Sequence, residues 1–306
     1  MKSNSNTDNG LPFAHFQRHK WPKQNKGGII LLKNHFLSQS LLQAWKNYKS
    51  QVHLSRRKAS PKNIHQLRIA TQRLEAMLTL IDGLKPTDDS KVIVSSVKKV
   101  RKNLGPLRDC QVESNTLNHF NESKSKKKSH KGFFIFFKKE KIDIKKKARK
   151  ILENISLKPE KKCLDKLAKK LTRIEELKNK KQIQHRLALK IKSTQLKFKR
   201  ALRKIDPERA KKIHKFRILA KKLRYQEEYL NTIMGSSQAN LDHLKTVQSV
   251  AGKIQNDTVL LETMNRYLAK RHRYKDTEAI KIRKRIERNQ AKIIKTDFNK
   301  LCSHPK

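Results

Sequence analysis

The 306-residue sequence is poor in glycine and proline, with eight of each, and aromatic residues make up only 6% of it. Sandwiches and barrels need many turn residues, and collagen-like arrays need a glycine repeat, so this composition argues against all three. Lys, Leu, Ile, Gln, Glu and Ala dominate the long stretches instead. Because these residues favour helix, the sequence predicts an all-α protein.

Cysteine is also scarce: Cys110, Cys163 and Cys302 lie far apart and form no C-x-x-C pair. Neither a disulfide framework nor a zinc knuckle is therefore indicated, and a reducing compartment fits best. The longest early apolar run, residues 29–32, is too short for a signal-peptide core or a membrane span. We expect a cytoplasmic protein with no transmembrane segment.

Acidic residues are few, since 26 Asp and Glu stand against 76 Lys and Arg, which gives a formal net charge of +50 and a pI near 10.5. Repulsion on such a surface is relieved when a polyanion binds and small counterions are released. The candidate partners are DNA, RNA, an anionic membrane surface and inorganic polyphosphate. Composition alone does not choose among them.

Hydrophobic periodicity divides the chain into helices. Residues 1–27 lack this periodicity and are predicted to form a flexible tail. A helical pattern begins at Gly28, and Ser60-Pro61 is a specific start signal for the next helix. Short connections between the helices indicate bundles. The expected helices are 28–45, 61–84, 88–104, 106–121, 160–180, 182–205, 207–234, 238–252, 254–274 and 276–300.

The segment 124–159 is predicted to be a Lys-rich insert between two bundles. Its first part, 124–150, holds thirteen Lys and Arg but only two acids, and an aromatic run at 133–137 interrupts it. We expect a solvated connector whose aromatic run packs onto a neighbouring bundle. The alternative is a loop that contacts a membrane or a nucleic acid, because basic residues beside aromatic ones suit an anionic interface.

A motif occurs twice in the chain. IHQLRIATQRLEAMLTLI at 64–81 recurs as IHKFRILAKKLRYQEEYL at 213–230, and each copy is preceded by a proline helix start, the second at Asp206-Pro207. A glycine follows the motif histidine after 40 residues in the first copy and 38 in the second. This offset is too long for a solenoid and indicates a duplicated domain. The predicted bundles are 28–123 and 160–306.

Placed on a helix at about 100° per residue, each motif separates an apolar stripe from a basic face. The basic face would match a phosphate chain lying along the helix, since Arg can bind two phosphate oxygens at once. The alternative is an ordinary solvent face. The stripes are Leu67, Ala70, Leu74, Leu78 and Ile81, then Phe216, Leu219, Leu223 and Leu230; the polar faces include His65, Arg68 and Arg73, then His214, Arg217, Lys221, Lys222 and Arg224.

These motifs, together with LGPLRDCQV after the first and AGKIQNDTVLL after the second, resemble the CHAD family, the conserved histidine α-helical domain. The resemblance implies two antiparallel helical bundles related by a pseudo-twofold axis, with a basic central groove that binds inorganic polyphosphate. It also implies association with polyphosphate granules. The predicted polyphosphate-binding residues are His65, Arg68, Arg73, Lys98, Arg101, Lys102, His214, Arg217, Lys221, Lys222 and Arg224.

The chain departs from the family pattern at several positions. Gln72 and Glu75 stand where the pattern is usually basic, which predicts weaker binding by the first repeat. Gln111 replaces a second Asp after Asp109, and Asn256 takes the matching fourth position after Gly252. No E-x-E-x-K motif of a CYTH domain occurs. The resemblance therefore implies a stand-alone binding module.

Enzyme activity is not expected. The H-x-x-R motif is similar to a histidine-kinase phosphoacceptor helix, but no proline follows either histidine and no glycine-rich ATP-binding domain is recognised. Hydrolysis would usually need carboxylates that hold metal ions. The acids are scattered, and no metalloprotease, P-loop or nucleophile-elbow motif occurs. We therefore expect neither cofactor nor metal, and we expect the two histidines to add affinity below about pH 6.5.

The alternative function is nonspecific RNA or DNA binding at low salt. The pI and basic clusters such as 283–288 favour it. The low aromatic content and the lack of a recognisable stacking platform disfavour it.

Overall fold

The computed structural model describes residues 35–121, 131–206, 210–234, 239–270, 273, 275–299 and 301. All regular structure within them is helical, so the all-α prediction is confirmed. The α-helices are α1 (Phe36–Arg57), α2 (Pro61–Ile81), α3 (Asp88–Asn103), α4 (Gly105–Asn121), α5 (Lys131–Glu153), α6 (Lys158–Leu177), α7 (Lys180–Arg203), α8 (Ala210–Met234), α9 (Ala239–Leu268) and α10 (Thr277–Ile293), and η2 (Ile294–Phe298) is a π-helical turn.

The start of α2 follows the predicted capping pattern. Ser60 is extended, its hydroxyl accepts a hydrogen bond from the backbone N–H of Asn63, and Pro61 occupies the first turn. Such a cap contributes about 1 kcal/mol. The matching Pro207 before α8, the tail 1–27 and the helical start at 28–34 lie outside the described residues.

Helix α9 is continuous, although two helices meeting near Gly252 were predicted. A glycine weakens a helix by about 1 kcal/mol but still donates its backbone N–H. Here Gly252 is buried, and so are Val250, Ala251 and Ile254 around it. Burial of this stretch between neighbouring helices therefore outweighs the local cost, and the chain does not break.

The predicted insert contains helix α5. Phe133, Phe136 and Phe137 are buried, and the first two lie 5.3 and 5.4 Å from Tyr267 of α9, measured between ring centroids. The expected packing of the aromatic run is thus confirmed. Yet the segment is not a simple connector, because its apolar face belongs to a buried cluster that also includes Ile286 of α10. Residues 124–130 lie outside the described part of the chain.

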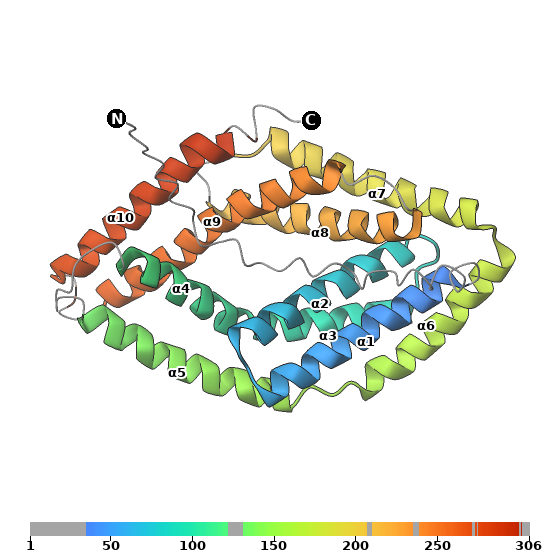
Figure 1. Cartoon of the computed structure of the whole chain (residues 1–306), viewed down its shortest axis with the longest axis horizontal. Helices are drawn as coiled ribbons and strands as arrows, with labels where there is room; N and C mark the ends of the chain where they lie inside the picture. Colours follow the sequence, from blue (N-terminus) through green and yellow to red (C-terminus); the bar gives the residue numbers. More distant parts are fainter. Residues whose placement is uncertain are drawn as a thin grey trace, which may run out of the picture. The chain divides into compact units, whose positions relative to one another are not determined.

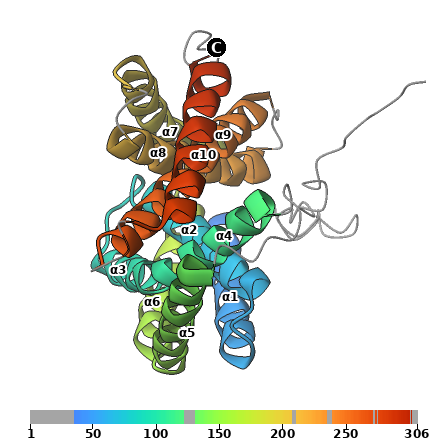
Figure 2. The same ribbon diagram turned by 90° about the vertical axis from the view of Figure 1, so that its left-hand side faces the viewer.

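The helices form two groups that meet at the motif helices (Figures 1 and 2). Helices α1 and α3 pack against α2, and α6 packs against α1 and α3. Helices α7 and α9 pack against α8, and α10 packs on α9. The position of α6 differs from the grouping expected for 160–306, because its buried residues Leu164, Leu167 and Leu171 pack in the first group, against α1 and α3. The domain limits, the duplication and the twofold axis stay predictions.

Helix α2 packs directly against α8, which brings the two motifs together. The predicted stripe of α2 is buried in full, and in α8 Phe216 and Leu223 are buried while Leu219 and Leu230 are half-buried. With the apolar stripes in the core, the basic faces of both helices remain at the α2–α8 contact or at the surface. None of the described helices is both long and apolar enough to cross a bilayer.

Candidate anion-binding site

Six partly buried cations from four helices lie close enough to affect one another electrostatically. Beyond the effect of burial, the positive charges of Arg68, Arg101, Arg217 and Arg224 lower the pKa of Lys221 of α8. Those of Arg68 and Arg217 likewise lower the pKa of Arg108 of α4. We name this group the α2–α8 cationic cluster: Arg68, Arg101, Arg108, Arg217, Lys221 and Arg224. Five of the six were predicted from the sequence. Arg108 was not predicted, although it lies in the segment LGPLRDCQV that follows the first motif.

Lys221 is the most strongly perturbed cation of the cluster. Burial lowers the pKa of its ammonium well below the ordinary value, and the four neighbouring arginines lower it further. Burial also lowers the pKa of Arg68, Arg108 and Arg217. Because low-dielectric surroundings strengthen repulsion between like charges, the neighbouring arginines destabilise the charged form of Lys221.

The two motif arginines have equivalent neighbours. A Cβ atom added at Gly105 would lie 3.9 Å from Nη1 of Arg68, and one added at Gly252 would lie 3.6 Å from Nε of Arg217. The Nη1 group of Arg68 donates a hydrogen bond to the carbonyl oxygen of Arg101 at 2.8 Å. Each glycine thus lies beside a motif guanidinium group, and an added Cβ would make an ordinary van der Waals contact with it.

The buried Nε of Arg217 has no hydrogen-bond partner among the described residues. Asp109 of α4 interacts electrostatically with Arg68, Arg108, Arg217 and the imidazole of His214. Asp109 therefore balances only part of the positive charge of Arg68, Arg108 and Arg217, and the Nε of Arg217 keeps an unused donor.

The motif histidines lie outside the core, as predicted: His65 is half-buried and His214 is exposed. Nδ1 of His214 lies 2.6 Å from Oε1 of Gln255 on α9. With an amide oxygen as partner, we assign the proton of a neutral ring to Nδ1. Nε2 then becomes a donor only when the ring is protonated. This geometry agrees with the expected gain of affinity at low pH, which stays a prediction.

Four predicted phosphate ligands are already paired with carboxylates. Oε2 of Glu228 lies 3.4 Å from Nη2 of Arg73, and Oε1 of Glu228 lies 2.9 Å from Nη1 of Arg224. Glu75 contacts Arg101 and lies 3.5 Å from Nζ of Lys98. The sequence predicts these four cations only as phosphate ligands, whereas the structure also gives each of them an ion pair.

Both carboxylates act at packed helix contacts. Glu228 joins α8 to Arg73 of α2, and the guanidinium of Arg224 lies 4.4 Å from the ring centroid of Tyr225. Glu75, the acidic departure from the family pattern, joins α2 to α3. Arg73 and Arg224 therefore orient the motif helices, which leaves Arg68, Arg108, Arg217 and Lys221 as the cations best placed to bind an anion.

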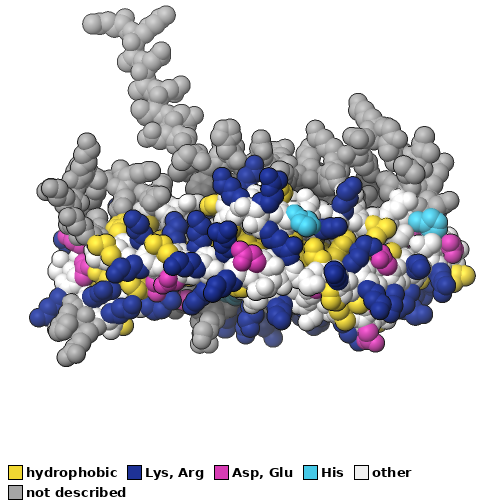
Figure 3. All heavy atoms as spheres, turned by 90° about the horizontal axis from the view of Figure 1, so that it is seen from below, with side chains coloured by type: hydrophobic (Ala, Val, Ile, Leu, Met, Phe, Trp, Pro, Cys, Tyr) yellow, Lys and Arg dark blue, Asp and Glu magenta, His cyan; other side chains and the backbone are white. Residues whose placement is uncertain are grey.

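Lys102 and Lys222 complete the predicted set, and both are exposed. Burial lowers the pKa of Lys222, the carboxylate of Glu75 raises it, and Lys197, Lys190 and Lys98 lower it further. Lys and Arg predominate on the face of the molecule shown in Figure 3, with few Asp and Glu among them. These lysines would extend an anion-binding surface beyond the cluster.

Among the described residues, no group of three or more His, Cys, Asp or Glu is arranged to hold a metal ion. The chemistry that the cluster offers is charge-assisted hydrogen bonding to an oxyanion.

Comparison with known proteins supports the family resemblance. The CHAD domain profile matches residues 39–265. The crystal structure of the CHAD domain from the plant Ricinus communis is similar, with a TM-score of 0.62 and 17% sequence identity over 83% of this chain and 86% of that one. Among curated proteins no match is found. Since the profile covers most of the chain, the protein belongs to the CHAD domain family.

Proposed function

We propose that the chain binds inorganic polyphosphate, without chemical conversion, through the α2–α8 cationic cluster. The observation that carries this proposal is the grouping of six partly buried cations from four helices where α2 packs against α8, with Lys221 among four arginines. A fold gains nothing from such a grouping of like charges. A bound polyanion supplies the negative charge that makes it favourable.

A linear phosphate polymer suits the distribution of the cations. The half-buried arginines offer forked donors for phosphate oxygens, and exposed lysines such as Lys102 and Lys222 would bind the chain further along. The family resemblance supports the same ligand and a place on cytoplasmic polyphosphate granules. The identity of the polymer is a proposal that rests on charge and geometry.

Nonspecific nucleic-acid binding is the second candidate. Helix α5 favours it, because Lys145, Lys146 and Lys147 are all exposed there and would contact a phosphate backbone. The cluster favours polyphosphate, because a partly buried site admits a narrow phosphate chain more easily than a sugar-phosphate backbone with bases.

The test replaces Arg108, Arg217 and Lys221 together by Gln. None of these three side chains makes an ion pair within 4.0 Å to a described residue. Each lost charge-assisted hydrogen bond contributes about 1.5 to 3 kcal/mol. We therefore expect polyphosphate affinity, measured by calorimetry at physiological salt, to fall at least about 100-fold while circular dichroism is unchanged.

The matched control replaces Lys145, Lys146 and Lys147 by Gln, which removes the same charge from the exposed face of α5. We expect it to change affinity less than about fivefold, because the loss is long-range and screened. Equal losses in the two variants would show that binding depends on net charge and not on the cluster.

A further inference from the structure

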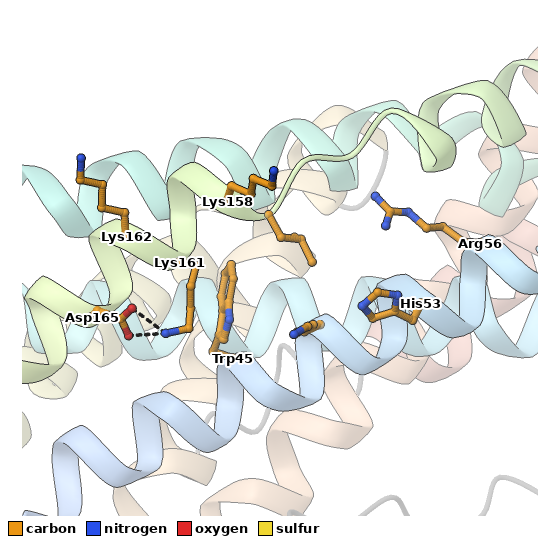
Figure 4. Close-up of a pocket in the computed structure, with 9 residues that line it drawn as sticks. Trp45, His53, Arg56, Lys158, Lys161, Lys162 and Asp165 are labelled. Carbon is orange, nitrogen blue, oxygen red and sulfur yellow. Dashed lines mark hydrogen bonds and ion pairs between the residues drawn. The ribbon is translucent and has the colours of Figure 1, made fainter.

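A pocket of about 560 Å³ lies between α1 and the start of α6, on helices that contribute nothing to the α2–α8 cationic cluster. Figure 4 shows the lining residues His53 and Arg56 on α1, and Lys158, Lys161 and Lys162 on α6. Its volume falls in the range of small-molecule sites, about 300 to 1,000 Å³. Its lining residues are Trp45, Lys49, His53, Arg56, Leu157, Lys158, Lys161, Lys162 and Asp165.

The inner wall of the pocket is apolar. Trp45 is 4% exposed and packs 5.4 Å from Tyr48, measured between ring centroids, so its indole is held in place. Leu157 lines the wall as well. The alkyl stems of the surrounding lysines add apolar surface. A simple phosphate chain gains nothing from such a wall, whereas a flat ring does.

The rim of the pocket is cationic. Lys49, His53, Lys158 and Lys162 are exposed, and no ion pair to a described residue is found for them. Lys161 pairs with Asp165, the one acid that lines the pocket. Arg56 donates from Nε to the carbonyl oxygen of Leu152 at the end of α5, at 2.8 Å, and from Nη2 to the carbonyl oxygen of Ile155, so it holds the loop before α6. A ligand with several negative charges complements this rim.

The first turn of α6 adds N–H donors. The residue before the helix, Leu157, makes no side-chain capping hydrogen bond, and Pro159 in the first turn has no N–H, so the donors that this turn offers are the backbone N–H groups of Lys158 and Glu160. Glu160 lies in this turn, but its side chain is buried and accepts a hydrogen bond from Ser96 of α3, away from the pocket rim. The positive end of a 20-residue helix thus lies beside Lys158 and Lys162.

We propose that this pocket binds a nucleoside di- or triphosphate, with the base against the Trp45 and Leu157 wall and the phosphates at the start of α6 and its lysines. The apolar wall and the cationic rim are both needed for this assignment. The site is separate from polyphosphate binding in residues and in helices, so the two proposals stand or fall independently.

The test uses the full chain with Trp21→Phe, which leaves Trp45 as the single tryptophan of the sequence. ATP and GTP are titrated while tryptophan fluorescence is recorded. We expect saturable quenching by both. Adenosine lacks the phosphates and tripolyphosphate lacks the base, so each should bind at least about tenfold more weakly.

Two further variants locate the site. Lys158→Gln with Lys162→Gln should weaken ATP binding at least about tenfold. The control, Lys166→Gln with Lys169→Gln, removes two exposed lysines of the same helix that do not line the pocket, and should bind ATP as the parent does. The Arg108, Arg217 and Lys221 triple variant should also keep the ATP signal.

Several results would overturn the proposal: no saturable quenching, tripolyphosphate binding as tightly as ATP, equal losses in the two lysine pairs, or loss of the ATP signal in the triple variant. None of them bears on polyphosphate binding by the cluster, which is measured separately.

Discussion

Lys221 is held where its charge is unfavourable to the fold. Its pKa is lowered by burial and by four arginines, while an unfolded lysine keeps its ordinary value near 10.5. Between the lowered and the ordinary pKa, the unfolded state binds more protons than the folded state. The free energy of unfolding therefore rises as the pH rises through that interval, and Lys221 destabilises the fold at lower pH.

We predict that Lys221→Met raises stability at pH 7 by about 1 to 2 kcal/mol, because it removes a buried like charge and keeps the apolar stem. Urea unfolding at pH 7 and at pH 10 measures the effect, which should shrink at the higher pH. Polyphosphate affinity should fall in the same variant, as expected of a residue kept for binding.

The control is Lys222→Met, which alters an exposed lysine beside it and should change stability by less than about 0.5 kcal/mol. A Lys221→Met variant that unfolds more easily than the parent at pH 7 would contradict this account of Lys221.

Part of the site could be predicted from residue types alone. The motif positions of Arg68, Arg217 and Lys221 on a polar helix face follow from helical periodicity. The pairing of Arg73 with Glu228 could not be predicted, because it joins α2 to α8 across 155 residues and depends on how those helices pack. The proximity of Arg217 to Gly252 could not be predicted either, because it depends on how α8 packs against α9.

At the scale of helices, Asp257 links α9 to α10. Its carboxylate is 4% exposed and accepts a hydrogen bond from Nδ2 of Asn289 at 2.8 Å. Burial raises its pKa to about 6. Asp257, the residue after Asn256 in the second copy, therefore takes part in helix packing.

We predict that this contact makes stability depend on acid pH. Between pH 4 and 6 the folded state keeps a proton that the unfolded state has released, so the free energy of unfolding falls as the pH rises through that interval. A shift of about two pH units corresponds to about 3 kcal/mol. Thermal unfolding from pH 4 to 7 measures the slope.

Burial also raises the pKa of Asp109, Glu113, Glu175 and Glu227, which contribute to the same slope. Asp257→Asn should therefore reduce the slope and raise stability at pH 7, because an amide oxygen still accepts from Asn289 without a buried charge. Asp143→Asn, an exposed change on α5, should leave the slope intact. A slope that is unchanged in Asp257→Asn would assign it wholly to the other carboxylates.

Helix boundaries were predicted well where local chemistry decides them, as at Ser60 and Pro61. They were predicted poorly where packing decides them. Gly252 does not end α9, because the surrounding residues are buried, and the Lys-rich insert forms α5, because its phenylalanines pack on Tyr267. Neither effect is visible in a window of sequence.

At the scale of the whole molecule, the order of helices along the chain does not decide their partners. Helix α6 follows the insert, yet it packs with α1 and α3. The family fold and the helical class could be predicted from the repeated motif, and the matched profile confirms the family. The grouping of the helices into bundles could not be predicted, because amphipathic helices of similar composition fit several neighbours.

The formal charge of +50 gives the chain affinity for any polyanion at low salt, so binding alone does not identify the partner. The partner is identified only by a difference in affinity between polyanions at physiological salt. The α2–α8 cationic cluster supplies that difference in our proposal, because it is partly buried and accepts a bare phosphate chain.

The most direct measurement is a competition at physiological salt between long-chain polyphosphate and RNA for the purified full chain, with concentrations expressed per phosphate. We predict that polyphosphate displaces RNA at a concentration at least about tenfold below that needed for the reverse. The Arg108, Arg217 and Lys221 triple variant should lose this preference. RNA that displaces polyphosphate from the parent protein at equal or lower concentration would contradict the account.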